Sequence, residues 1–308
     1  MTRTPGLLTF ASRGTECEAW HYGATTDALA DPSGRPVVVM AHGFGGTKDS
    51  GLAPFAEALA DAGLDVLAFD YRGFGGSGGH PRQVISLAGQ AEDYRAAVTA
   101  AGRLPGVDPG RIVLWGVSLS GGTVLEVAAG RSDIAAVVAV TPLVSGPAAA
   151  IAGRDLYPPA ASLRATARGL AAKVRGGRTL PIVAEPGEPA VLPLPGMKEA
   201  YLAIAGPSWR NEVDAAIVVD VLTHRPARRA DEINCPVLFQ IADFDRCAPP
   251  YAAAKAAFKA RALVHHYPAD HFDVYAGAPW HDAVVAHQTR FLTRILTALT
   301  REPACSPT

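Results

Sequence analysis

The fold of this chain is constrained most by a series of short, almost continuously apolar segments that recur along the sequence. Each is rich in Val, Ile, Leu or Ala, which is typical of strands whose two faces are both buried. Stretches with apolar residues at helical spacing separate several of them. This alternation predicts an α/β fold with a doubly wound, mostly parallel sheet. The predicted strands are residues 37–41, 66–69, 111–115, 135–140, 237–241 and 263–267, and the predicted helices are residues 54–63, 86–102, 123–130, 249–261 and 280–301.

The alternation of strands and helices stops between residues 143 and 230. This stretch lacks clear strands and holds a Pro-rich segment at residues 181–195. It is too long to be a structureless loop in a compact domain, so we expect a helical lid or cap inserted into the core. The other interpretation is a set of helices that only extends the core. The expected domains are a core of residues 1–142 and 231–308 and a lid of residues 143–230, with helices at residues 160–174, 197–205 and 211–222.

The composition argues against several classes of protein. With 308 residues, 49% of them hydrophobic, the chain is long enough for a large core. A net charge of −1 gives no reason to expect binding to nucleic acid or to an anionic membrane. Neither a membrane span nor a signal-peptide pattern is evident, so a cytoplasmic protein is expected. The cysteines lack the spacing of a zinc site or a disulfide framework and are expected to be free thiols: Cys17, Cys235, Cys247 and Cys305.

A serine at a junction between a strand and a helix is the main candidate for chemistry. Ser118 follows the predicted strand 111–115 and precedes an Ala- and Val-rich helical segment. Gly116, Ser120 and Gly121 around it are small, as a sharp turn that presents a nucleophilic side chain requires. The alternative is an ordinary turn in which the serine caps the helix.

A serine hydroxyl needs a histidine to take its proton and an acid to orient that histidine. The loops after two late strands carry both types of residue. Asp243 and Asp245 follow one predicted strand, and His271 follows the next. His265 and His266 lie inside that second strand, and we expect them to be structural or to face solvent.

These residues and the motifs around them resemble those of the α/β-hydrolase superfamily, in particular bacterial esterase-like serine hydrolases with a helical lid insertion. The order of nucleophile, acid and histidine along the chain is that of these enzymes. The pattern G-x-S-x-G departs from the family at Ser120, where a second Gly is usual, but Ser118 fits the register because Gly116 lies two residues before it. The matching segments are His42-Gly43-Phe44-Gly45-Gly46, the run from Asp70 to Ser77, Gly116-Val117-Ser118-Leu119-Ser120-Gly121, the Asp245 loop and Asp270-His271-Phe272.

The resemblance implies a catalytic triad of Ser118, His271 and Asp245. In the family the acid usually lies three residues beyond the small residue that ends its strand. Counting from Ala242 gives Asp245, and Asp243 is the alternative.

The resemblance also implies that the backbone N–H groups of Phe44 and Leu119 form the oxyanion hole. Aromatic side chains of the lid would supply an apolar wall to the substrate site. No metal ion or organic cofactor is expected. The expected substrate-binding residues are Phe44, Leu119, Tyr157, Trp209 and Phe272.

A second glycine pattern does not predict a nucleotide site. Gly73, Gly75 and Gly78 match G-x-G-x-x-G after a predicted strand. A dinucleotide fingerprint must lead directly into a helix, whereas the segment 80–82, His-Pro-Arg, follows here.

The sequence therefore predicts a serine hydrolase that cleaves a carboxylic ester through an acyl-enzyme. Enzymes that cleave amide or peptide, thioester or C–C bonds use the same triad and stay open as alternatives. A catalytically inactive α/β-hydrolase that acts as a binding protein is an alternative of another class. The expected partner is a small molecule with an apolar acyl or aryl group, rather than nucleic acid or a membrane, and a homodimer is compatible with the sequence.

Overall fold

The computed structural model describes residues 4–299, with the side chain of residue 155 excepted. Within these residues an eight-stranded sheet has the order β1-β2-β4-β3-β5-β6-β9-β10. Neighbouring strands from β4 to β10 run parallel, so the predicted mostly parallel sheet is confirmed. The strands are β1 Gly6–Ser12, β2 Thr15–Tyr22, β3 Arg35–Ala41, β4 Asp65–Phe69, β5 Val107–Val117, β6 Ile134–Val140, β9 Val237–Ala242 and β10 Leu263–Tyr267.

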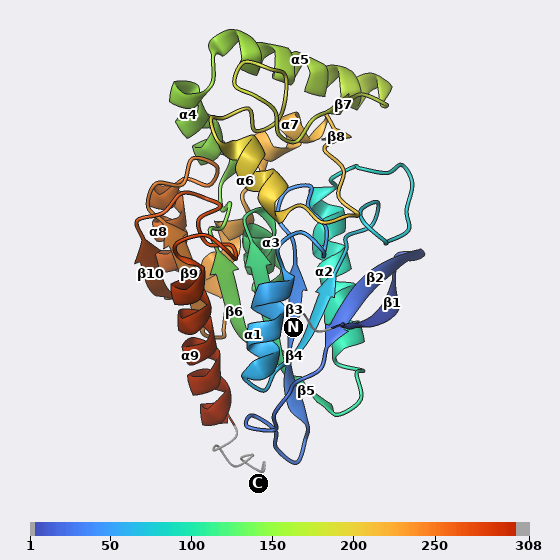
Figure 1. Cartoon of the computed structure of the whole chain (residues 1–308), viewed down its shortest axis with the longest axis vertical. Coiled ribbons are helices and arrows are strands. Elements are labelled where there is room, and N and C mark those ends of the chain that lie inside the picture. The colour runs from blue at the N-terminus through green and yellow to red at the C-terminus, as the bar shows by residue number, and fades with distance from the viewer. Residues whose placement is uncertain (1–3, 300–308) are drawn as a thin grey trace.

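Helices cover both faces of this sheet (Figure 1). Successive side chains of a strand point to opposite faces, and in β3 Val39 packs into one hydrophobic core while Met40 packs into the other. The first core is closed by α2 (Leu87–Ala101), α3 (Leu119–Ala128) and α8 (Pro250–Lys259), and the second by α1 (Ala53–Asp61) and α9 (His281–Leu299). Burial on both faces explains why the parallel strands are continuously apolar.

The N-terminal hairpin of β1 and β2 was not predicted from the sequence. Its strand β1 pairs antiparallel with β2, and β2 pairs antiparallel with β4. Arg13 and Gly14 form its turn with positive φ angles of 47° and 78°. Buried residues alternate with partly exposed ones in β2, so this strand lacks the continuous apolar run that marks the parallel strands.

The chain leaves the sheet after β6 and returns at β9, which pairs directly with β6. Figure 1 shows α4, α5 and α7 beyond one end of the sheet, with α6 between them and the core. The helices expected at residues 160–174 and 197–205 are present as α5 and α6. The elements of this insertion are α4 Gly146–Leu156, α5 Pro159–Arg175, β7 Thr179–Leu180, α6 Met197–Ile204, β8 Val213–Asp214, α7 Ile217–Asp220 and two 3₁₀ segments, Val221–Thr223 and Pro226–Glu232.

The helix predicted over residues 211–222 is wrong. A short strand, a single helical turn and a 3₁₀ turn take its place. The backbone N–H of Asp214 donates to the carbonyl of Gln83 at 2.7 Å, and that of Ala215 donates to the carbonyl of Arg178 at 2.8 Å. Because these amides bond to distant segments, they cannot belong to a continuous helix. Helix α4 and the small β7-β8 sheet were also missed.

Three further predictions concern membrane spans, the cysteines and the last helix. No helix in the described part of the chain is long and apolar enough to cross a membrane. Cys17, Cys235 and Cys247 are free thiols, as expected, whereas Cys305 lies outside the described residues. The last helix ends at Leu299 in the structure, and the remainder of its predicted range, residues 300–301, also lies outside them.

Candidate active site

Ser118 occupies the turn between β5 and α3 in a backbone conformation that is rare for a residue with a side chain. Its φ and ψ angles are 57° and −119°, and such strain is stored where the surrounding structure enforces it. A Cβ atom at Gly116 would lie 2.3 Å from the carbonyl oxygen of Ser120, and one at Gly121 would lie 2.9 Å from the side chain of Pro142. The turn is therefore closed too tightly for larger residues at these two positions.

The structure distinguishes the two serines of this turn. Ser120 is fully buried, and its hydroxyl donates to the carbonyl of Ala41 at 2.8 Å and accepts from the N–H of Val117 at 2.9 Å. The Ser120 hydroxyl is thus used to hold the turn against β3. Ser118 is partly exposed and lines a cavity.

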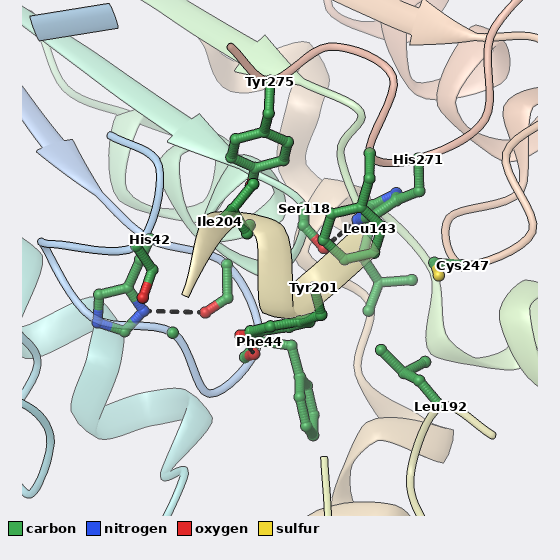
Figure 2. Close-up of a pocket in the computed structure, with 14 residues that line it drawn as sticks. His42, Phe44, Ser118, Leu143, Leu192, Tyr201, Ile204, Cys247, His271 and Tyr275 are labelled. Atoms are coloured by element: carbon green, nitrogen blue, oxygen red, sulfur yellow. Dashed lines mark hydrogen bonds between the residues drawn. The ribbon is translucent and has the colours of Figure 1, made fainter. Parts of the chain in front are cut away.

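His271 and Asp245 approach Ser118 on the loops that follow β10 and β9. His271 Nε2 lies 3.0 Å from Ser118 Oγ, and His271 Nδ1 lies 2.7 Å from Asp245 Oδ2. Figure 2 shows the imidazole beside the serine hydroxyl. The structure therefore brings together, in one hydrogen-bonded chain, the three residues that the sequence singled out.

The orientation of Asp245 is set by its own loop. Its Oδ1 accepts hydrogen bonds from the N–H groups of Cys247 at 2.7 Å and Ala248 at 2.6 Å. This leaves Oδ2 for His271 Nδ1, an arrangement that favours a proton on Nδ1 and a free lone pair on Nε2.

The alternative acid and histidines have other partners. Asp243 Oδ1 lies 2.6 Å from His266 Nδ1, and both side chains are exposed. The His265 ring stacks on that of His287 at a centroid distance of 3.8 Å. These contacts are all away from Ser118, so the geometry favours Asp245 over Asp243.

The pKa of His271 is raised above its ordinary value. Burial by itself lowers the pKa of an imidazole, but here the hydrogen-bonded carboxylate of Asp245 and the charge of Asp270 outweigh burial. The neutral ring is the form that accepts a proton from Ser118. A raised pKa thus means that the base becomes available only at higher pH.

We therefore predict that kcat/KM for a hydrolysed substrate rises with pH as the imidazole of His271 loses its proton. Below its pKa the ring is protonated and cannot act as a base, so activity falls. Because the pKa is raised, the midpoint lies above the value of about 6.5 for a free imidazole. A kcat/KM profile on an uncharged ester checks this, and a midpoint below the free-imidazole value would contradict it.

The amides of Phe44 and Leu119 belong to two segments that meet at Ser118. Leu119 is the next residue in the chain, and Phe44 follows Gly43, where an added Cβ atom would lie only 3.0 Å from Ser118 Cβ. Within the described part of the chain neither amide has a hydrogen-bond acceptor. Two free N–H groups close to a nucleophile are what a tetrahedral oxyanion needs.

Comparison with known proteins establishes the family. The family model described as serine aminopeptidase, S33, matches residues 32–284. The chain belongs to this S33 family of hydrolases. Over 304 residues it is 36% identical to the quorum-quenching protein AidA of Acinetobacter baumannii (strain MDR-ZJ06), covering 96% of each chain.

Two further similarities connect this S33 hydrolase to fungal proteins. A stretch of 109 residues, 35% of this chain and 34% of the other, is 42% identical to the thiohydrolase aneE of Aspergillus aculeatus. The crystal structure of the α/β-hydrolase GrgF from Penicillium sp. sh18 superimposes with a TM-score of 0.74 at 23% identity, covering 95% of this chain and 99% of that one. This confirms the α/β-hydrolase fold.

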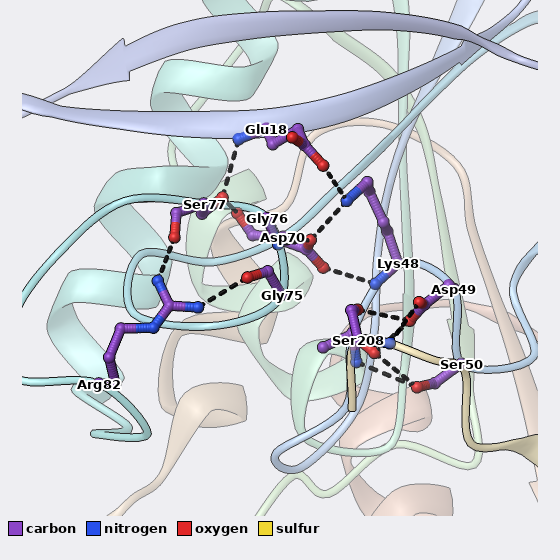
Figure 3. A network of polar contacts seen from close by, with 11 residues as sticks. Glu18, Lys48, Asp49, Ser50, Asp70, Gly75, Gly76, Ser77, Arg82 and Ser208 are labelled. Carbon is purple, nitrogen blue, oxygen red and sulfur yellow. Dashed lines mark hydrogen bonds and ion pairs between the residues drawn. The ribbon is translucent and has the colours of Figure 1, made fainter. Parts of the chain in front are cut away.

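In this S33 hydrolase a buried ion-pair network holds the loop that carries Phe44 (Figure 3). The Lys48 ammonium lies 2.6 Å from Asp70 Oδ2 and 2.6 Å from Glu18 Oε1, and the Lys48 N–H donates to Asp70 Oδ1 at 2.6 Å. Burial by itself lowers the pKa of Lys48. The charge of Asp70 and the hydrogen bonds to Asp70 and Glu18 raise the pKa by more, so its net shift is upward.

The same network explains Gly75, the middle glycine of the second glycine pattern, and its neighbour Gly76. The N–H of Gly76 donates to Asp70 Oδ2 at 2.9 Å. A Cβ atom at Gly75 would lie 2.0 Å from that oxygen, and one at Gly76 would lie 2.0 Å from Glu18 Oε1. These two glycines let the loop close over the buried carboxylate of Asp70 and the partly exposed carboxylate of Glu18, which is a structural role.

The insertion of this S33 hydrolase contacts the same loop at three points, one of which is the N–H of Gly206, which donates to Ser50 Oγ at 3.4 Å. The Tyr201 hydroxyl of α6 donates to the carbonyl of Phe44 at 2.7 Å. Ser208 donates to Asp49 through its N–H and its hydroxyl, each at 2.9 Å (Figure 3). The bond from Tyr201 holds the carbonyl of the residue whose N–H is one of the two free amides, and no sequence pattern indicates this contact.

Three of the five predicted substrate-binding residues line two cavities. Phe44 and Phe272 line a cavity of about 70 Å³ at Ser118, and Phe44 and Tyr157 line another of about 380 Å³. Leu119 and Trp209 are absent from both walls; Trp209 stacks behind Tyr201 at a centroid distance of 5.0 Å.

Cys247 was not predicted as a site residue, yet it lines both cavities. Its place two residues after Asp245 was the available signal. Burial raises the pKa of its thiol, and the charges of Asp245 and Asp270 raise it further. In the described residues Asp245, Cys247 and His271 are also a group whose ligand atoms lie within 4.8 Å of one another. Asp245 and His271 already bond to each other, so we assign no metal to them.

Proposed function

We propose that this protein is a serine hydrolase that cleaves carboxylic esters through an acyl-enzyme. The observation that carries the proposal is the chain of contacts from Ser118 Oγ through both nitrogens of His271 to Asp245, at 3.0 Å and 2.7 Å. These are the distances at which a base takes the proton of its nucleophile and an acid fixes the tautomer of that base.

The proposed reaction has two halves. In the first, Ser118 Oγ attacks the ester carbonyl while His271 Nε2 takes its proton, and His271 then gives that proton to the departing alcohol oxygen. In the second, water attacks the acyl-enzyme with the same base, and the acid is released with Ser118 restored. The N–H groups of Phe44 and Leu119 stabilise the oxyanion in both halves.

The substrate we propose is a small molecule with an apolar acyl or aryl group, and the insertion is proposed as its lid. The cavity at Ser118 is lined by Phe44, Leu143 and Phe272 among other apolar residues, which supports a substrate of this kind. A thioester is the second candidate, because the similarity to a thiohydrolase covers a third of the chain.

A fluorophosphonate probe tests the nucleophile directly. We expect wild-type protein to be labelled covalently at Ser118, as seen by peptide mass spectrometry, and Ser118→Ala to be unlabelled. Ser120→Ala is the matched control, and the covalent label on this variant should still be found at Ser118. Labelling of neither wild type nor Ser120→Ala would instead indicate a binding protein.

The bond type is tested with matched substrates of one acyl group. We expect burst kinetics on its p-nitrophenyl ester, with an initial release of one p-nitrophenolate per labelled site. The corresponding thioester and anilide are compared by kcat/KM. A higher value for the anilide than for both other substrates would overturn the assignment to esters.

A further inference from the structure

A second and larger cavity lies within the insertion, next to the one at Ser118. Its volume is about 380 Å³, against about 70 Å³ for the cavity at the nucleophile. Phe44, Leu143, Leu192 and Cys247 line both. The large cavity therefore begins one side chain away from the reacting centre, and Figure 2 shows Leu192 and Cys247 at that side of the site.

Small residues on two helices of the insertion create the space. Four of them recur at helical spacing along α4, so they share one face of that helix, and α5 adds alanines from the other side. Larger side chains on these faces would fill the cavity. The small residues in its wall include Gly146, Ala149, Ala150, Gly153, Ala161 and Ala165.

Most of the remaining wall is apolar, and two of its three charged residues have partners of their own. Arg246 Nε donates to Asp270 Oδ2 at 2.6 Å, and Glu188 Oε2 accepts the N–H of Glu185 at 3.2 Å. Arg154, the third, is exposed at the last turn of α4. A cavity of this composition suits a hydrocarbon chain better than a charged or sugar-like group.

Taking the proposed function as given, we infer that the substrate carries one long, flexible apolar arm that occupies this cavity, while the group on the other side of the carbonyl is small. The large cavity, at about 380 Å³, has more than five times the volume of the cavity at Ser118, at about 70 Å³, so the longer arm belongs in the large cavity. The substrate class is thus an ester or thioester with one medium-length alkyl or alkenyl chain, and the faces of α4 and α5 set its length.

The test combines substrates of graded length with variants that fill the cavity. The acyl series is p-nitrophenyl acetate, butyrate, octanoate and decanoate, and the alcohol series is butyl, octyl and decyl acetate. The variants are Ala150→Phe on α4 and Ala161→Phe on α5, both of which line the cavity. Ala160→Phe is the matched control, because this exposed neighbour on α5 is absent from the cavity wall.

In wild type we expect kcat/KM to rise by at least about tenfold from the shortest to the octyl or octanoyl member of one series, since each buried methylene adds up to about fourfold. Both cavity variants should lose about tenfold or more on the longest substrate and keep their activity on the shortest. Ala160→Phe should follow wild type. The series that responds identifies whether the arm belongs to the acid or the alcohol.

A flat profile for wild type in both series would overturn the inference, as would unchanged profiles for both cavity variants. Either result would leave the proposed function intact, because esters would still be hydrolysed. Absence of hydrolysis for every substrate, with no fluorophosphonate label on Ser118, would refute the proposed function itself.

Discussion

Replacing Asp245 with Asn is expected to lower kcat by about four orders of magnitude. The amide of Asn can donate a hydrogen bond to His271 Nδ1, which would move the ring proton to Nε2. A protonated Nε2 cannot accept the proton of Ser118 from its distance of 3.0 Å. The pH at which the remaining activity is half-maximal should also fall, since the carboxylate that raises the pKa of His271 is gone.

Asp243→Asn is the matched control for this experiment. Asp243 lies on the same loop, but it faces the exposed His266 instead of His271. Its substitution should leave kcat within about twofold of wild type, as expected for an exposed contact away from Ser118. Steady-state kinetics on one ester, with folding checked by circular dichroism, decides the matter. A larger loss in Asp243→Asn than in Asp245→Asn would exchange the roles of the two carboxylates.

Replacing Lys48 with Met is expected to lower the free energy of unfolding by about 3–5 kcal/mol. Lys48 is 3% exposed, and its removal leaves the fully buried carboxylate of Asp70 without its counterion. Glu18 loses its partner as well. An uncompensated buried charge costs far more than the ion pair itself contributes.

Urea unfolding measures this effect, with Lys255→Met as the control at an exposed position. The control should shift the free energy of unfolding by no more than about 0.5 kcal/mol. Equal urea midpoints for the two variants would mean that Asp70 is protonated or hydrated at little cost in free energy. That result would contradict our interpretation of the network.

The parallel core was predictable because burial on both sides leaves a strong mark on a sequence. The run from Val37 to Ala41 is one example, since both faces of β3 pack into cores. Ser118 was predictable for a related reason, because its turn tolerates little but small neighbours such as Gly116. Asp245 could be chosen over Asp243 only through the resemblance, whereas the structure separates them by their partners.

The parts that escaped prediction depend on contacts between distant segments. The predicted helix over residues 211–222 fails because the amide of Asp214 pairs with Gln83, far away in the chain. The bond from Tyr201 to Phe44 spans 157 positions and has no local pattern. The large cavity arises because small residues of α4 and α5 leave space between the two helices. The sequence of either helix alone does not reveal this space.

The hydrogen bonds from Tyr201, Gly206 and Ser208 that join the insertion to the Phe44 loop also restrict how a substrate can enter. A rigid flap that swung away as one body would break the bonds from Tyr201 and Ser208 and pull the Phe44 amide out of line. Helix α5 buries only Gly169 and Ala172. If the outer helices alone are displaced to admit a substrate, the amides of Phe44 and Leu119 stay in place, so the proposed oxyanion hole need not be reassembled for each molecule that enters.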